Sequence, residues 1–269
     1  MNKELLETLL SQQMELNTNI SGPLWPFGKT NKGKTINWGR TVYMETAELI
    51  DSYPWKHWKG IENNIDIDNV GIELIDLWHF IMSMGIEVMF NVYVQQGKER
   101  YGSDQVYPNE QNVPFIWEKS LKEETVNYFL KIFENEEMKK RIISDIQKKM
   151  EDISGIDKEI FIFEELMSNG ILYAQTRDIE EKYMYFATIV MIFDYIITNV
   201  VNLDIEKVYK GKSILNQFRQ DHGYKEGTYI KTWILDSKEV EDNVVMLRLL
   251  DSENLYEELE KVYKEVEGS

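Results

Sequence analysis

Hydrophobic residues recur along most of the chain at intervals of three and four positions, the spacing that places them on one face of an α-helix. Leu5, Leu9 and Leu16 follow this spacing in the first such segment. No segment of any length alternates between apolar and polar residues as a half-buried strand does. The pattern therefore predicts an all-α fold, a helical bundle without significant sheet. The predicted helical segments are residues 3–18, 38–51, 68–95, 118–154, 157–201 (as two helices), 204–221, 239–250 and 252–267.

Proline and glycine mark the boundaries between these helices. Residues 20–37 contain Gly22 and Pro26 among several helix-breaking residues and predict a loop. Pro54 ends the second helix, because the residue before a proline avoids the α-helical region. Residues 96–117 are polar and contain both glycine and proline, so we interpret them as a connection or an insertion.

Composition and charge narrow the classes of function. A chain of 269 residues, of which 43% are hydrophobic, has ample material for a folded core. Its 30 basic and 47 acidic residues give a net charge of −17, which disfavours nucleic acid and anionic membranes as partners. A nucleotide could still bind where a local basic cluster and metal ions offset that charge. Because the chain has no cysteine, disulfides, zinc–thiolate sites and cysteine nucleophiles are excluded.

The apolar segments predict a cytoplasmic protein without a membrane span. The N-terminal residues 1–6 lack the uninterrupted apolar run of a signal peptide. The most apolar run, residues 185–201, is interrupted by Asp194 and Asn199 and is short for crossing a bilayer. We therefore expect this run to form a buried core helix.

Two acidic pairs stand inside apolar helical patterns. Glu45 and Glu48 are three residues apart, and so are Glu73 and Asp76, which places each pair on one helix face. Carboxylates among apolar residues are costly unless a positive charge meets them. If the two helices face each other, four carboxylates converge, a ligand set that suits Mg²⁺ or Mn²⁺. Acidic pairs at this spacing are also common on helix surfaces, so the pattern alone leaves a solvated face open.

Two further segments carry candidate binding chemistry. Lys212, Asn216 and Arg219 share one helix face, at spacings of four and three, and a glycine-containing segment follows them. On pattern alone, this helix face is either a solvent-exposed surface or a binding face. The segment Trp55-Lys56-His57-Trp58-Lys59 is dense in rings and cations. It is either a packed corner or a wall on which a base stacks, with His57 or Trp58 nearby and Lys59 within reach of phosphate.

The motif Glu45-x-x-Glu48 followed by Glu73-x-x-Asp76 resembles the metal motifs of the all-α nucleoside triphosphate pyrophosphatases. Longer strings surround and follow it, namely Tyr43-Met44-Glu45-x-x-Glu48-Leu49-Ile50-Asp51-Ser52, Trp55-Lys56-His57-Trp58-Lys59, Glu73-x-x-Asp76-x-Trp78-His79-Phe80 and Lys212-x-x-Leu215-Asn216-x-Phe218-Arg219-Gln220-x-x-Gly223-Tyr224-Lys225-x-Gly227-x-Tyr229. Together these strings resemble one branch, the dimeric dUTPases. The resemblance is weakest at about residues 96–155. We therefore expect a single all-α domain over residues 1–269, with a variable helical and loop insertion there.

The resemblance implies a homodimer that hydrolyses dUTP, and also dUDP, to dUMP by attack at the β-phosphorus. It implies two or three Mg²⁺ ions per site, with Mn²⁺ as a possible substitute, and a nucleotide but no nucleic acid or membrane as partner. Glu48 would be the catalytic base that takes a proton from the attacking water. The implied metal ligands are Glu45, Glu48, Glu73 and Asp76.

The resemblance also implies which residues contact the substrate. Gln13 would contact the uracil, with the adjacent Gln12 as the alternative register, and Asn216 would offer the base a donor and an acceptor. His79 would lie beside the base. Phosphate oxygens would be met by lysine, arginine and tyrosine side chains of the third block. The predicted substrate-binding residues are Gln13, Asn17, His57, Trp58, Lys59, His79, Lys212, Asn216, Arg219, Tyr224, Lys225 and Lys231.

Three alternatives to a dUTPase follow from the same residues. Another all-α pyrophosphatase, of the MazG or dCTP-hydrolysing kind, shares the acidic motifs but lacks the third block. A di-iron carboxylate bundle requires two Glu-x-x-His units, whereas this chain has three histidines and one Asp-x-x-His, at Asp76 and His79. The last alternative is a non-catalytic helical interaction protein whose acidic pairs lie on its surface.

Overall fold

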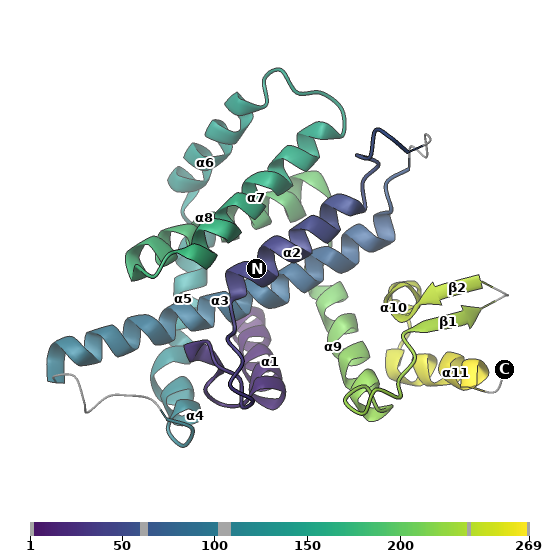
Figure 1. The fold of residues 1–269 in the computed structure, drawn as a ribbon, viewed down its shortest axis with the longest axis horizontal. Helices are drawn as coiled ribbons and strands as arrows, with labels where there is room; N and C mark the ends of the chain where they lie inside the picture. The colour runs from purple at the N-terminus through teal and green to yellow at the C-terminus, as the bar shows by residue number, and fades with distance from the viewer. Residues whose placement is uncertain (1–2, 60–63, 102–108, 236–237, 268–269) are drawn as a thin grey trace.

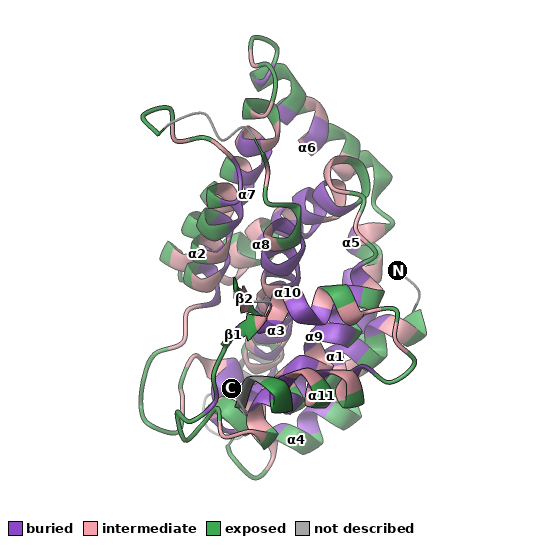
Figure 2. Cartoon of the chain, turned by 90° about the vertical axis from the view of Figure 1, so that its right-hand side faces the viewer, coloured by how far each residue is buried: buried purple, intermediate pink, exposed green. Residues whose placement is uncertain are grey.

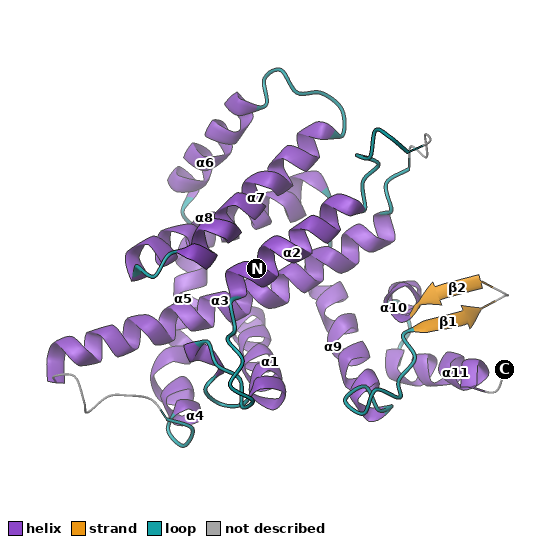
Figure 3. Cartoon of the chain, in the orientation of Figure 1, coloured by secondary structure: helices purple, strands orange, loops and turns teal. Residues whose placement is uncertain are grey.

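The structure is a computed structural model that describes residues 3–59, 64–101, 109–235 and 238–267. It is mostly helical, with one small two-stranded sheet, which confirms the predicted all-α class (Figure 3). The α-helices are α1 (Lys3–Ser21), α2 (Trp38–Asp51), α3 (Ile67–Tyr101), α4 (Val113–Ile116), α5 (Lys122–Phe133), α6 (Glu136–Lys149), α7 (Asp157–Gln175), α8 (Ile179–Tyr195), α9 (Ile205–Asp221), α10 (Asp242–Leu249) and α11 (Leu255–Glu267). A 3₁₀ turn (Trp25–Phe27) and two π-helical turns (Trp117–Leu121 and Ile196–Val200) complete the helical elements.

The long helix α3 runs across the molecule (Figure 1). On one side α2 packs against both α3 and α7, and α8 packs against α7 and α3. On the other side α1 and α9 contact α3. The α2–α7 crossing is close at Gly39 and Gly170, because a Cβ atom built on Gly39 would lie 2.6 Å from the carbonyl oxygen of Gly170. This contact fixes the position of α2, the helix that carries Glu45 and Glu48.

Side-chain caps explain where several helices begin. The side chain of Asn37 accepts a hydrogen bond from the backbone N–H of Arg40 at the start of α2. Asp178 and Asp204 cap α8 and α9 in the same way. Asn37 and Asp204 stand directly before the apolar pattern of their helices, so the starts of α2 and α9 lie within one residue of the predicted boundaries.

Buried residues line the inward faces of the helices, and the loops and outer faces are exposed (Figure 2). Trp78 of α3 stacks on Phe193 of α8, with ring centroids 5.5 Å apart. By length and composition, α3 and α8 could each cross a membrane, but core helices pass the same test, and 67% of the apolar window of α3 is buried within the fold. Packing therefore accounts for the apolar character of α3.

The C-terminal elements form a small lobe with its own hydrophobic cluster. Antiparallel strands β1 (Thr232–Leu235) and β2 (Lys238–Glu241) form the hairpin, and fully buried Trp233 packs with Leu215 and Phe218 of α9. A hairpin alone is marginal in water, so this anchor stabilises it. The sequence showed no strand here, because β1 is apolar apart from Thr232 and shows no alternation. As a result, α10 begins at Asp242 and not at the predicted residue 239.

Candidate functional site

Three of the four predicted metal ligands converge between α2 and α3. One carboxylate oxygen each from Glu45, Glu73 and Asp76 lies within 4.8 Å of the other two. Glu73 is buried, while Glu45 and Asp76 are partly exposed. Glu48, one turn after Glu45 on α2, is exposed and lies outside this triplet. We call Glu45, Glu73 and Asp76 the carboxylate triplet.

In the triplet, burial and mutual repulsion of the carboxylates outweigh the nearby positive charge of Lys212. Burial and the charge of Asp76 raise the pKa of Glu45 to about 7 and that of Glu73 to about 8. A hydrogen bond joins the side chains of Glu45 and Glu73, which requires a proton on at least one of the two carboxyl groups. A divalent cation among these oxygens would replace that proton, and hard cations such as Mg²⁺ and Mn²⁺ prefer such oxygen ligands. The residues present therefore fit a divalent metal site.

Stability without metal is expected to depend on pH because of these raised pKa values. Between pH 4.5 and about 8 the folded chain holds protons on Glu45 and Glu73 that the unfolded chain releases. Raising the pH through this interval therefore favours unfolding. Without divalent cations, the melting temperature should fall between pH 5.5 and 8.5, and Mg²⁺ should abolish the fall.

Differential scanning fluorimetry across this pH interval, with and without Mg²⁺, measures the effect. The Glu73→Gln variant serves as the matched control, because it removes the most strongly shifted carboxyl group of the triplet. Its melting temperature should vary less with pH than that of the wild type. Equal pH dependence in both proteins would contradict the assignment.

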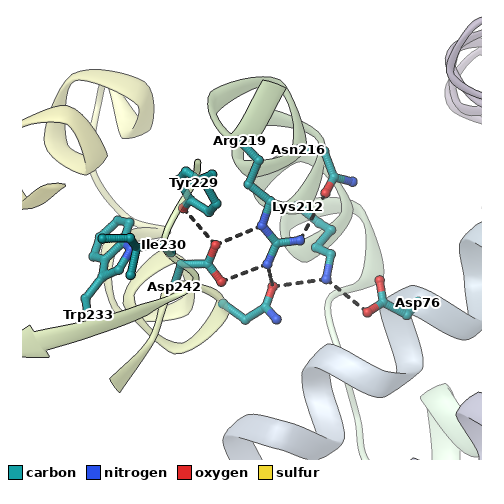
Figure 4. Close-up of polar contacts among 9 residues, drawn as sticks. Asp76, Lys212, Asn216, Arg219, Tyr229, Ile230, Trp233 and Asp242 are labelled. Atoms are coloured by element: carbon teal, nitrogen blue, oxygen red, sulfur yellow. Dashed lines mark hydrogen bonds and ion pairs between the residues drawn. The ribbon is translucent and has the colours of Figure 1, made fainter. Parts of the chain in front are cut away.

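Lys212 supplies a cation next to Asp76, one member of the triplet (Figure 4). Its Nζ donates a hydrogen bond to Asp76 Oδ2 at 2.9 Å and a second to Asn243 Oδ1 at 3.0 Å. The side chain is almost fully buried. The structure therefore brings the first residue of the third sequence block onto the second acidic motif, 136 positions away.

Arg219 lies about two turns after Lys212 on the same face of α9. Asp242 holds its guanidinium group (Figure 4). Its Nε and Nη2 donate to the two carboxylate oxygens of Asp242 at 2.8 and 2.7 Å. Burial alone would lower the pKa of Arg219, but hydrogen bonds and charge from Asp242 outweigh burial and raise it. Nη1 lies 3.4 Å from Asn216 Oδ1, a long contact. Asn216 is thus only loosely held.

A hollow of about 230 Å³ opens beside Asn216. Its walls include Asn216 and Tyr209 of α9 and Gln12 of α1. Gln13, the glutamine predicted to contact the base, is instead 2% exposed and does not line the hollow. Of the two adjacent glutamines, the structure therefore places Gln12 at the hollow with Asn216.

Gln13, Asn17 and His79 form a buried hydrogen-bond network with Ser83. Gln13 Oε1 lies 2.7 Å from His79 Nδ1, and Asn17 Nδ2 donates to Ser83 Oγ at 2.8 Å. Burial lowers the pKa of His79 to about 4, so its ring is neutral at pH 7. The ring stacks on Tyr209 at a centroid distance of 4.6 Å. Through His79, this buried network therefore contacts Tyr209, a residue in the wall of the hollow.

The remaining predicted substrate residues lie on exposed segments. Within the described ranges, no hydrogen bond or ion pair joins any of them to the carboxylate triplet. Trp58 is 62% exposed and packs edge-to-face against Trp55 and His57. The ammonium of Lys231 lies 5.1 Å from the ring centroid of Tyr224. The residues in this group are His57, Trp58, Lys59, Tyr224, Lys225 and Lys231.

Sequence reasoning missed Asp242 and Asn243. Asp242 is fully buried, and its Oδ2 also accepts a hydrogen bond from the Tyr229 hydroxyl at 2.8 Å. Asn243 Oδ1 lies 3.1 Å from Arg219 Nη2. Both residues fell within the helix predicted at residues 239–250, and a polar pair in such a segment gives no signal of partners about twenty residues or more away.

A comparison with protein families gives one match. The family described as dUTPase matches residues 5–224, about four-fifths of the chain. No curated protein matches it. The matched segment contains both acidic motifs and Lys212, Asn216 and Arg219, whereas α10 and its Asp242 and Asn243 lie outside it.

Proposed function

The chain belongs to the all-α dUTPase family, and on this basis we propose that it hydrolyses dUTP, and also dUDP, to dUMP with Mg²⁺ as cofactor. Family membership by itself supports a nucleotide pyrophosphatase. One observation carries the site assignment: the carboxylate triplet and Lys212 of the third sequence block meet in one place, with Lys212 Nζ 2.9 Å from Asp76. Hydrolysis of a phosphoanhydride requires acidic ligands that hold a metal ion and a positively charged side chain that meets the phosphates.

The acidic side of the site would hold the metal and the base. Glu45, Glu73 and Asp76 are proposed to be ligands of the cation, joined by Glu48 from the exposed end of the cluster. Bound Mg²⁺ neutralises phosphate oxygens and makes a water more acidic. Glu48 is proposed to take the proton of the attacking water, since its side chain is exposed one turn from Glu45. We also propose that the site holds two or three Mg²⁺ ions and that the water attacks the β-phosphorus.

The opposite side would hold the nucleotide. Lys212 and Arg219 are proposed to meet the phosphates, with Tyr224, Lys225 and Lys231 approaching from the exposed segment that follows α9. The hollow beside Asn216 is proposed to take the uracil, with the amides of Asn216 and Gln12 as hydrogen-bonding groups. Selection for uracil over cytosine would follow, because the wrong base leaves these amides unpaired.

The Asn216→Ala variant is expected to lose activity on dUTP with little change in stability. Asn216 is partly exposed, and the one side-chain hydrogen bond that it accepts within the described segments, at 3.4 Å, is long. Removing one hydrogen bond to the base should lower kcat/KM for dUTP about tenfold. Lys210→Ala, on an exposed position of the same helix, is the matched control and should keep wild-type kcat/KM. Unchanged kcat/KM in Asn216→Ala would remove this residue from the base site.

Release of pyrophosphate from dUTP, dCTP, dTTP and dATP, with Mg²⁺ or excess chelator, tests the proposal directly. We expect turnover of dUTP only, and only with Mg²⁺. Equal turnover of dCTP would instead favour a related all-α pyrophosphatase of broader specificity. Activity in excess chelator would exclude the metal mechanism, and a protein that binds neither Mg²⁺ nor nucleotide would be an interaction protein.

A homodimer and a cytoplasmic location are further expectations from the family. Sedimentation of the purified chain tests the first, and cell fractionation tests the second. A monomer that is fully active would show that one chain forms a complete site.

A further inference from the structure

Asp242 and Asn243 touch both cations of the proposed phosphate side, although they lie beyond the segment that the family match covers. They open α10, directly after the strand β2. The backbone N–H of Asp242 donates to the carbonyl of Lys231 at 2.9 Å, which ties the start of α10 to the segment entering the hairpin. The C-terminal lobe thus places two polar side chains against α9.

Asn243 joins Lys212 and Arg219 through one oxygen atom. Its Oδ1 accepts from Lys212 Nζ at 3.0 Å and from Arg219 Nη2 at 3.1 Å (Figure 4). Two cations repel each other at close range, and both side chains lose rotamer freedom when they are held. A shared acceptor offsets both effects without adding a negative charge.

Asp242 determines which donors of Arg219 stay available. It occupies Nε and Nη2, and its own position is fixed by the Tyr229 hydroxyl. Among the residues that the structure describes, Nη1 has one hydrogen-bond contact, the 3.4 Å contact with Asn216. The N–H groups left for a ligand are therefore on the Nη1 side, next to the hollow that Asn216 lines.

We propose that Asp242 and Asn243 are positioning residues that hold Arg219 and Lys212 as a preformed pair of donors for the phosphate groups of the nucleotide. This inference rests on the proposed function, in that it takes Lys212 and Arg219 as the phosphate-binding residues. Preorganisation of both cations lowers the entropy that phosphate binding costs. The competing explanation is a purely structural tie between α10 and α9.

Two substitutions at Asn243 separate these explanations. Asn243→Asp places a carboxylate within hydrogen-bonding distance of both cations, which strengthens a structural tie but repels phosphate. Asn243→Ala removes the shared acceptor. The matched control is Asn254→Asp, which adds the same charge to the same lobe at an exposed position whose side chain accepts from the N–H of Glu257.

The experiment is a calorimetric titration of each protein with inorganic pyrophosphate in Mg²⁺, together with its melting temperature. We expect Asn243→Asp to bind about tenfold more weakly, the size of effect of one added charge at close range. Asn243→Ala should bind about fivefold more weakly, because a neutral hydrogen bond is lost. Asn254→Asp should match the wild type, and Asn243→Asp should melt no lower than the wild type.

Wild-type affinity in Asn243→Ala would overturn the positioning role, and wild-type affinity in Asn243→Asp would show that phosphate does not approach this pair. A wild-type protein that does not bind pyrophosphate would overturn it as well. Because the titration needs no turnover, the two proposals fail separately. If the Asn243 variants bind pyrophosphate more weakly as expected but the wild type does not hydrolyse dUTP, only the proposed function is wrong. If the wild type hydrolyses dUTP but the Asn243 variants bind pyrophosphate as it does, only this inference is wrong.

Discussion

Replacing Glu48 with glutamine is expected to leave dUTP binding close to that of the wild type and to lower kcat by about 10²–10⁴-fold, the contribution of a general base. Glu48 lies one turn after Glu45 on α2 and is exposed. Its carboxylate accepts no hydrogen bond from any side chain in the described segments and lies outside the triplet. Glutamine keeps its size and one oxygen while removing the basic site. The variant should therefore retain the complex and lose the proton transfer.

Single-turnover release of pyrophosphate, with calorimetric binding of dUTP, distinguishes the two parts of this result. The matched control is Asp51→Asn, a further exposed carboxylate at the end of α2, which pairs with Lys56 and accepts from Trp55 Nε1 at 3.1 Å. It should stay within about twofold of wild-type kcat, as expected of a surface ion pair remote from the chemistry. Full activity in Glu48→Gln would remove Glu48 from the base role. Loss of binding together with kcat would make it chiefly a metal ligand.

Asp242→Asn is expected to destabilise the chain by about 3–5 kcal/mol, the cost of leaving a buried charge without its partner. Asp242 is 0% exposed and accepts three hydrogen bonds, two from Arg219 and one from Tyr229. An amide has one oxygen and no charge, so it cannot satisfy all three donors. The guanidinium of Arg219, itself buried, would be left uncompensated.

Urea unfolding measures this loss. Asp251→Asn, in the same lobe, is the matched control, because Asp251 forms an ion pair with Lys207 but is 92% exposed. Its cost should be below about 1 kcal/mol. If both variants lose the same small amount, the Asp242–Arg219 pair does not anchor the lobe. Combining Asp242→Asn with Arg219→Gln should recover part of the stability, since the unpaired charge is then absent.

The clustering of the three carboxylates could be predicted because its signal is local. Carboxylates three residues apart on apolar helices face inward together, and Glu73 is indeed buried next to Asp76. Spacing alone does not decide the position of Glu48, because Glu73 and Asp76 have the same spacing and both belong to the triplet. Glu48 is exposed and stays outside the triplet because of how α2 is turned against α3, which the three-residue spacing does not contain.

The glutamine that lines the hollow could be predicted only to within one position. Gln12 and Gln13 are neighbours on α1 and point about 100° apart, so one faces the interior and the other the hollow. Apolar periodicity does not decide between them, because the buried glutamine is accommodated by polar partners, Ser83 and His79, that lie far away in sequence. The sequence pattern does not show which residues that are far apart in the chain pair with each other.

The C-terminal lobe shows the same limitation more strongly. Trp233 is fully buried and Ile234 is 62% exposed, yet both are large apolar residues in one short run. Strand and helix are hard to distinguish in such a run. Asp242 reaches Arg219 because the hairpin ends directly before it, at Glu241. The contact could therefore be identified only from the three-dimensional structure.

The hydrogen bond between Lys212 and Asp76 links the two halves of the proposed site. Without a mineral ion, this ammonium group meets part of the negative charge of the triplet, at one of its three carboxylates. A divalent ion held by the triplet would compete with the amine for that carboxylate, while Asn243 would still hold the amine from the other side. Under the proposed function, occupancy by the ion and docking of the polyanionic tail of a nucleotide would therefore be coupled.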